Sequence, residues 1–271
     1  ILPGYYKGQE LNIVTVFEAV GQNAAGKLSD EDLKEIEKRA IPGTGSCGGM
    51  YTANTMSSAF EAMGMSLPYS STMANPHDEK MNSAKESAKV LLEAIRKNIK
   101  PRDIVTRKAI ENAVAVIMAT GGSTNAVIHL IAIAGRLGVE LKLEDFDRLG
   151  SEMPCLVNLQ PSGQYLMEDF CYAGGLPVVM KEILGHLHGD VLTVSGHTVA
   201  ENVSQAQNYN PEVIKTVAKP FKDKAGIAKV DRQVRVETVK VASRAKAVAA
   251  KTTNAASATN VSAGVTTIAH N

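Results

Sequence analysis

The sequence has no tryptophan, few aromatic residues and almost no net charge. Aromatic residues make up 4% of the 271 residues, which argues against the stacking platforms that proteins use to bind nucleic-acid bases. The formal net charge is +1, so the chain shows no electrostatic preference for nucleic acid or for an anionic membrane. No apolar run approaches the roughly 20 residues of a membrane-spanning helix. The length is sufficient for a real core in one large or two modest domains.

Cysteine is also scarce, and its count bears on where the protein works. The three cysteines are Cys47, Cys155 and Cys171. An odd and sparse set argues against a disulfide framework and favours a reducing interior, either the bacterial cytoplasm or the interior of an organelle. The chain begins at Ile1 without a methionine or a signal-like segment, and we interpret it as a fragment whose beginning is missing.

The most informative segment that is present is the glycine-rich stretch 42–56, which places Cys47 among four glycines. Glycine lets another group approach the backbone closely. We expect a helix to begin near Tyr51 and to direct its free N–H groups and positive dipole end toward this loop. That setting favours a thiolate. From these residues alone, Cys47 could be a nucleophile, a metal ligand or a buried residue of a tight turn.

The hydrophobic pattern alternates short apolar runs with amphipathic segments, which is typical of an α/β domain. It predicts helices over 29–39, 81–98, 106–119 and 124–137, with Ser29 as the N-cap of the first. Strands are expected at 11–17, entering a helix, and at 191–194. Met50, Met56, Met63 and Met65 are expected to fill the core.

The composition changes after about residue 220. No acidic residue follows Glu237, and the remainder is rich in alanine, threonine, serine and asparagine. We therefore divide the chain into an α/β domain over 1–220 and a divergent, poorly ordered tail over 221–271. A frame change or fusion is one origin for this tail, and a native weak helix over 238–251 followed by disorder is the other.

Several motifs resemble those of the dihydroxy-acid and phosphogluconate dehydratase family, and they occur in the family's order over roughly residues 1–220. The longest are Ser-Cys-Gly-Gly-Met-Tyr-Thr-Ala-Asn-Thr-Met at 46–56, Glu-Ala-Met-Gly-Met-Ser-Leu-Pro at 61–68 and Gly-Gly-Ser-Thr-Asn-Ala-Val-Ile-His-Leu at 121–130, with shorter matches at 4–9, 17–21, 100–103, 161–163, 187–190 and 198–202. Within the family, the sequence at 47–56 most resembles that of the dihydroxy-acid dehydratases.

The resemblance implies a partial N-terminal α/β domain, with a parallel or mixed sheet flanked by helices and without the family's barrel-like C-terminal domain. It implies a hydro-lyase that dehydrates 2,3-dihydroxy acids to 2-keto acids in isoleucine, valine and leucine synthesis. In such enzymes an iron–sulfur cluster, [2Fe–2S] or [4Fe–4S], acts as a Lewis acid, and Mg²⁺ holds the substrate carboxylate. The alternatives are an aldonate or phosphogluconate dehydratase and a catalytically inactive paralogue that acts in binding or assembly. Family members are commonly homodimers.

The resemblance also assigns residues. Cys47 corresponds to the third of three cluster cysteines, with Gly48, Gly49, Thr52 and Asn54 around the cluster. The other two cysteines, most magnesium ligands and the catalytic base have no counterpart here, so this chain alone is expected to be inactive.

A second group of candidates lies where a glycine pair opens a helix. Ser123, Thr124 and Asn125 are candidates for the substrate side, against simple helix capping. His129 is a further candidate, against a place in the core. Buried free thiols are the expectation for Cys155 and Cys171, and surface placement is the expectation for the adjacent acids Glu168 and Asp169 and for His186 and His188.

Overall fold

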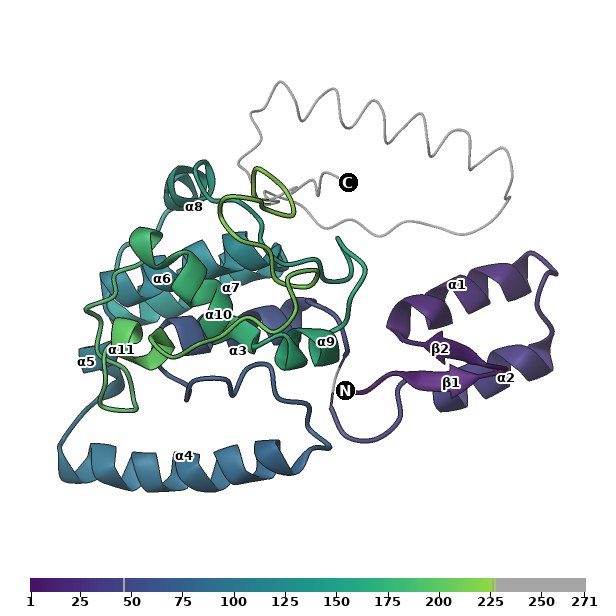
Figure 1. The fold of residues 1–271 in the computed structure, drawn as a ribbon, viewed down its shortest axis with the longest axis horizontal. Helices are drawn as coiled ribbons and strands as arrows, with labels where there is room; N and C mark the ends of the chain where they lie inside the picture. The colour runs from purple at the N-terminus through teal and green to yellow at the C-terminus, as the bar shows by residue number, and fades with distance from the viewer. Residues whose placement is uncertain (46, 226, 228–271) are drawn as a thin grey trace.

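The chain folds as an α/β structure in which helix dominates (Figure 1). The computed structural model describes residues 1–45, 47–225 and 227. Its elements are β1 (Gly4–Tyr6), β2 (Gln9–Leu11), α1 (Ile13–Ala24), α2 (Asp30–Arg39), α3 (Thr52–Ala62), α4 (Asp78–Arg96), α5 (Pro101–Ile104), α6 (Arg107–Thr120), α7 (Asn125–Leu137), α8 (Leu143–Gly150), α9 (Met167–Tyr172), α10 (Gly175–Glu182), the 3₁₀ helix η1 (Leu184–His186) and α11 (Val199–Val203).

The sheet corrects the expectation of a parallel or mixed arrangement. Among the described residues it consists of β1 and β2 alone, and these pair antiparallel. Their connection is the dipeptide Lys7-Gly8, with φ of 49° and 78°. Two consecutive residues with positive φ form a tight hairpin turn, and so short a connection allows only antiparallel pairing.

The prediction of a strand at 191–194 is also wrong. The chain reverses at 195–196, and only an isolated antiparallel bridge between Leu192 and Thr198 forms there. The strand expected at 11–17 is shorter, because β2 ends at Leu11 and α1 begins at Ile13.

The predicted helices are confirmed, with small shifts at their ends. Ser29 Oγ accepts the N–H of Asp32 at 3.1 Å and caps α2. Gly121 ends α6 in the left-handed region, with φ of 63°, a conformation that glycine adopts without strain. The first helix after the glycine-rich loop, α3, begins at Thr52 with Tyr51 as its N-cap residue, as expected.

Helix α6 lies at the centre of the main hydrophobic core. Eleven of its residues, 109, 110 and 112–120, are buried, and only Glu111 interrupts this run. Helix α3 packs along α6, and α7, α8 and α10 also contact α6. Met50 and Met63 are buried in this core, and Met56 and Met65 pack against it, which confirms their role as core residues.

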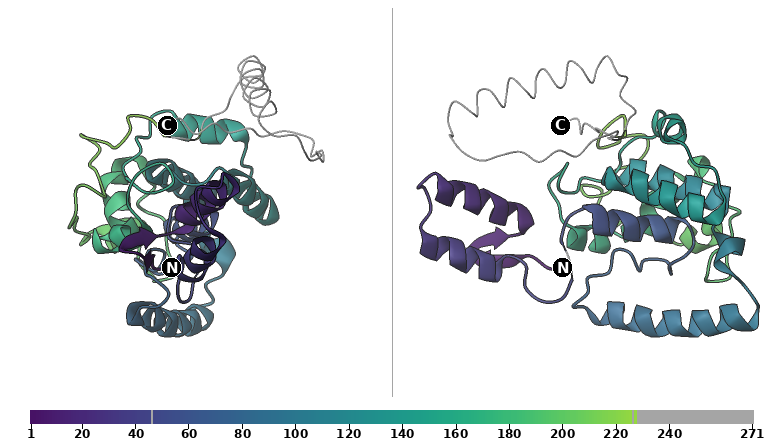
Figure 2. Two further views of the ribbon diagram at one scale, coloured as in Figure 1. Left: turned by 90° about the vertical axis from the view of Figure 1, so that its right-hand side faces the viewer. Right: turned by 180° about the vertical axis from the view of Figure 1, so that it is seen from behind.

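A smaller unit formed by the hairpin, α1 and α2 lies to one side of the main body in both Figure 1 and Figure 2. Its own core consists of Leu11, Ala19, Ile36 and Ala40. Helix α4 runs along another side of the body and has no fully buried residue.

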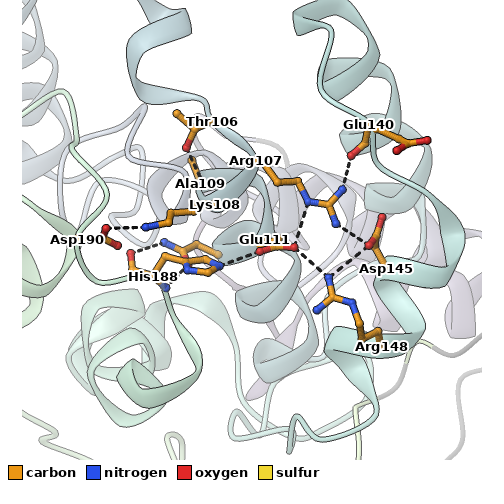
Figure 3. A network of polar contacts seen from close by, with 11 residues as sticks. Thr106, Arg107, Lys108, Ala109, Glu111, Glu140, Asp145, Arg148, His188 and Asp190 are labelled. Atoms are coloured by element: carbon orange, nitrogen blue, oxygen red, sulfur yellow. Dashed lines mark hydrogen bonds and ion pairs between the residues drawn. The ribbon is translucent and has the colours of Figure 1, made fainter.

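A polar network joins α6, α8 and the 187–190 loop (Figure 3). Glu111 accepts hydrogen bonds from Arg107 at 3.1 Å and from Arg148 at 2.9 Å, and it contacts His188 Nε2 at 2.8 Å. Both arginines also pair with Asp145. Burial acts to raise the pKa of Asp145, but the hydrogen bonds from Arg107, from Lys142 N–H and from Arg148 outweigh it and hold this pKa at about 2.

The last described residues remain attached to the body. Cys155 pairs with Lys222 in an antiparallel bridge, Ala225 N–H donates to Met153 O at 2.8 Å, and Ile227 is buried in the main core. The rest of the predicted tail, including the helix suggested for 238–251, lies outside the described residues.

Candidate functional site

Cys47 borders a polar pocket of about 210 Å³. The first turns of α3 form one side of it, through Ala53, Asn54 and Ser57. The segment between α3 and α4 and the beginning of α4 form another side, through Ser71, Thr72, Met73, Ala74, Asn75 and Lys80, and the start of α9 contributes Met167 and Glu168. Cys47 is half-buried, so its thiol lies between the protein interior and this pocket.

Asn54 fixes the geometry of the cysteine. Its Nδ2 amide donates to Gly49 O at 2.7 Å, and it contacts Cys47 Sγ at 3.3 Å and Cys47 O at 3.4 Å. The sulfur itself lies 3.6 Å from Gly49 O. An amide that donates to sulfur stabilises a thiolate more than a thiol, and such contacts tune metal-bound sulfur.

The glycines hold the loop against the body. Gly48 O accepts the N–H of Met167 at 2.7 Å, and Met50 N–H donates to Gln160 O at 2.7 Å. A Cβ at Gly49 would lie 2.6 Å from the Tyr51 ring and 3.0 Å from Gln160 O, so only glycine fits without displacement. Both glycines are buried. They shape the loop through their backbone.

The structure brings residues 52–55 of the first motif together with the 121–130 motif at the N-terminal end of α3. Thr52 Oγ1 lies 3.0 Å from Ser123 Oγ and accepts from Asn125 Nδ2 at 2.9 Å. Ser123 N–H donates to Thr55 Oγ1 at 2.9 Å. These residues hydrogen-bond one another, and none of Thr52, Ser123 or Asn125 lines the Cys47 pocket.

The two remaining candidates from the 121–130 motif lie at the start of α7 and on its surface. Thr124 is the N-cap residue of α7 but makes no side-chain capping bond. His129 is exposed one turn further along, so it is not the core residue that an apolar helix favours. Neither residue lines the Cys47 pocket.

Neither of the other two cysteines lines the pocket. Cys155 is buried beside Lys222, and Cys171 is half-buried on α9. Burial raises the pKa of both thiols, which favours their protonated, non-ligating form. Cys155 is thus the buried free thiol that was expected, whereas Cys171 is free but only half-buried.

Several residues of the pocket were not predicted from the sequence. They lie at 71–75 and at Lys80, and the buried carboxylate of Glu61 accepts hydrogen bonds from this part of the chain. The one signal at sequence level is the run Pro68-Tyr69-Ser70-Ser71, since proline followed by serine residues favours a turn. No residue type in that run indicates a pocket by itself.

The donor set present fits one ligand of a metal group, because Cys47 offers a half-buried sulfur to a pocket. Within residues 1–45, 47–225 and 227, no group of three or more histidine, cysteine, aspartate or glutamate side chains is placed to hold a metal ion. The described part of the chain therefore supplies a single thiolate toward a cluster, and one cysteine does not hold an iron–sulfur cluster alone. None of the described helices is long and apolar enough to cross a membrane.

Fold and site together define a helix-rich α/β protein whose candidate site is built around one half-buried cysteine. The family model described as dihydroxy-acid/6-phosphogluconate dehydratase N-terminal matches residues 1–202. The chain belongs to this family.

Among similar proteins are the dihydroxy-acid dehydratases of Polaromonas naphthalenivorans and Polaromonas sp. strain JS666, both 67% identical over 226 residues. That of Leptothrix cholodnii is 62% identical over 225 residues. Each alignment covers 82% of this chain and 40% of the relative. The chain thus spans about 40% of the length of these relatives.

Proposed function

We propose that the protein carrying this chain is a hydro-lyase that dehydrates 2,3-dihydroxy acids to 2-keto acids in branched-chain amino-acid synthesis. Because the chain spans about 40% of its relatives' length, the activity is assigned to the whole protein. The observation that carries the proposal is a cysteine facing a polar pocket in a chain 67% identical to proteins named dihydroxy-acid dehydratase.

Within that function, Cys47 is proposed to be one thiolate ligand of an iron–sulfur cluster. The cluster, when bound, supplies Lewis acidity toward a substrate hydroxyl. This chain supplies the sulfur and its orientation: Asn54 donates toward Sγ, and the Gly48–Met167 and Met50–Gln160 backbone bonds fix the loop on either side. The remaining cluster ligands, and most ligands of the Mg²⁺ ion, are assigned to parts of the protein outside this chain.

The contacts among Thr52, Ser123 and Asn125 support a role at the rim of the same site. They fix the start of α3, which carries Ala53 and Asn54 into the pocket lining. Thr124 and His129 are kept as substrate-side candidates together with Ser123 and Asn125. A homodimer and a location in the cytoplasm, or in an organelle if the source is eukaryotic, are part of the same proposal.

The comparisons favour the dihydroxy-acid substrate over a sugar acid. The family description covers both the dihydroxy-acid and the 6-phosphogluconate dehydratases, but the relatives at 67% identity carry the dihydroxy-acid name. No observation favours a catalytically inactive paralogue.

Two measurements on the full-length protein test the proposal. After anaerobic reconstitution, we expect Cys47→Ser to lose cluster iron and visible absorbance, while Cys155→Ser retains both because Cys155 is buried away from the pocket lining. Unchanged iron in Cys47→Ser would refute the ligand assignment. We expect turnover of 2,3-dihydroxyisovalerate, and activity on aldonic acids alone would overturn the substrate assignment.

A further inference from the structure

The side of the pocket formed by residues 71–75 is tied to α3 through one buried carboxylate. Glu61 lies near the C-terminal end of α3 and is 6% exposed. Its Oε1 accepts the N–H of Tyr69 at 2.8 Å, and its Oε2 accepts the N–H of Ser71 at 2.9 Å. Both carboxylate oxygens are thus used by backbone groups of one turn, and bonds to a charged acceptor are among the stronger hydrogen bonds in proteins.

The turn that Glu61 holds has a backbone conformation that needs support. Tyr69 has φ of 69°, in the left-handed region that is rare for a bulky side chain and costs roughly 1–2 kcal/mol. A residue keeps such a conformation only where its surroundings determine it strongly. The bond from Tyr69 N–H to Glu61 is a direct determinant, and Thr72 N–H also donates to Tyr69 O at 3.2 Å.

A second attachment comes from α4. Lys80 Nζ donates to Ser70 O at 2.7 Å, so the residue between the two Glu61 partners is also held by α4. The next residues along the chain, 71–75, line the pocket together with Cys47 and Asn54. Asn54 lies on the same helix as Glu61, two turns earlier. Helix α3 therefore fixes both the cysteine, through Asn54, and the facing segment, through Glu61.

We propose that Glu61 is a positioning residue for the candidate site: its buried carboxylate fixes the 69–72 turn to α3 and thereby sets the shape of the pocket beside Cys47. The inference rests on the proposed role of Cys47 for its functional meaning. Burial raises the pKa of Glu61 to about 7, against the opposing effects of the hydrogen bonds from Ser71 and Tyr69 and of the nearby charge of Lys80. Burial makes ionisation of Glu61 costly, yet its side chain still accepts hydrogen bonds from two backbone N–H groups. The turn, rather than solvent, is therefore the partner of this side chain.

Hydrogen exchange at pH 8, where the carboxylate is ionised, tests the attachment in the 271-residue chain. In Glu61→Ala we expect exchange of the Tyr69 and Ser71 amides to accelerate about tenfold or more, since each loses its acceptor. Glu61→Gln, which keeps one acceptor oxygen, should show a smaller acceleration and serves if the alanine variant does not fold. The matched control is Glu111→Ala, which removes a partly buried glutamate from the network of Figure 3 and leaves the turn intact.

The reactivity of the Cys47 sulfur tests the functional part of the inference. The rate of Cys47 alkylation by iodoacetamide, measured by mass spectrometry on its peptide, should rise about fivefold or more in Glu61→Ala relative to Glu111→Ala. Cys155, which is buried, reports global opening and should not change. Equal Cys47 rates in the two variants, or a parallel rise at Cys155, would overturn the proposal, as would unaltered exchange at 69–71. Neither assay contains iron or substrate, so their outcome does not depend on whether Cys47 is a cluster ligand.

Discussion

At the residue scale, the geometry around Cys47 depends on an absent side chain. Gly49 has no room for a Cβ, which would approach the Tyr51 ring to 2.6 Å and Gln160 O to 3.0 Å. Gln160 O is also the acceptor for Met50 N–H. A methyl group here would overlap a backbone group that already anchors the loop. Overpacking of this kind typically destabilises a folded protein by about 1–3 kcal/mol.

We therefore expect Gly49→Ala to lower the free energy of unfolding by about 2 kcal/mol, measured by urea denaturation. Gly21→Ala is the matched control: it lies in α1, and its added Cβ meets nothing within 4 Å. Alanine in an exposed helix interior should raise stability by roughly 0.5–1 kcal/mol. Equal effects of the two substitutions would contradict the packing that the structure shows at Gly49.

Asn54 and Glu61 show how residues of one helix can differ in what the sequence reveals. Asn54 belongs to a recognisable motif and could be placed near the cysteine in advance. Glu61 opens the 61–68 motif, but the sequence assigned it no role, because its hydrogen-bond partners lie in a turn eight to ten residues away. Its contribution becomes visible only when the partners of its two oxygens are known.

At the element scale, α7 and α4 are both apolar in part but differ in what covers them. Leu130 on α7 is 0% exposed and belongs to the main core. Leu92 on α4 is 54% exposed and lies with Met81, Leu91 and Ile95 among the exposed apolar residues of that helix. Sequence periodicity predicted both helices equally well and could not tell which apolar face is buried.

The two leucines give a paired test of this difference. Leu130→Ala should cost about 2–5 kcal/mol of unfolding free energy, because it removes buried methyl groups and leaves a cavity. Leu92→Ala should change stability by less than about 0.5 kcal/mol. Thermal or urea unfolding of the isolated chain measures both, and a large loss for Leu92→Ala would show that α4 packs more closely than the structure indicates.

At the scale of the whole molecule, the sequence predicted the local elements better than their assembly. Ser29, Thr106 and Gly121 mark helix ends through short-range chemistry, and such signals lie within a few residues of each other. The sheet was predicted wrongly, because the apolar run expected to form a strand at 191–194 is irregular and the one at 11–17 lies mostly in α1. Pairing partners are long-range contacts, and a single sequence does not specify them.

The same contrast applies to the site. The sequence motif placed Cys47, Gly48, Gly49 and Asn54 in one group. In the structure the first three lie along one loop, and Asn54 hydrogen-bonds to Cys47 and Gly49. The far side of the pocket, at Ser71 and Lys80, was missed because it is brought there by the path of the chain between α3 and α4.

The stability of the whole molecule should depend on pH through two carboxyl groups that act in opposite directions. Burial raises the pKa of Glu61 from 4.5 to about 7, so the folded state holds this proton more tightly than the unfolded state. Its contribution to stability is fully present below pH 4.5 and is lost as the pH rises through about 7. Asp145, with a pKa lowered from 3.8 to about 2 by its arginine partners, contributes stability above pH 3.8 that is lost as the pH falls toward 2.

Stability should therefore be greatest near pH 4–5 with respect to these two groups, and the Glu61 contribution should fall by about 2.5 kcal/mol between pH 5 and pH 8. Urea unfolding at a series of pH values, compared with Glu61→Gln, isolates this contribution because glutamine does not titrate. The difference between the two proteins should decline from pH 5 to pH 8, because all other groups are common to both. A difference that stays constant over this range would mean that Glu61 is ionised throughout and that its burial is compensated in the folded chain.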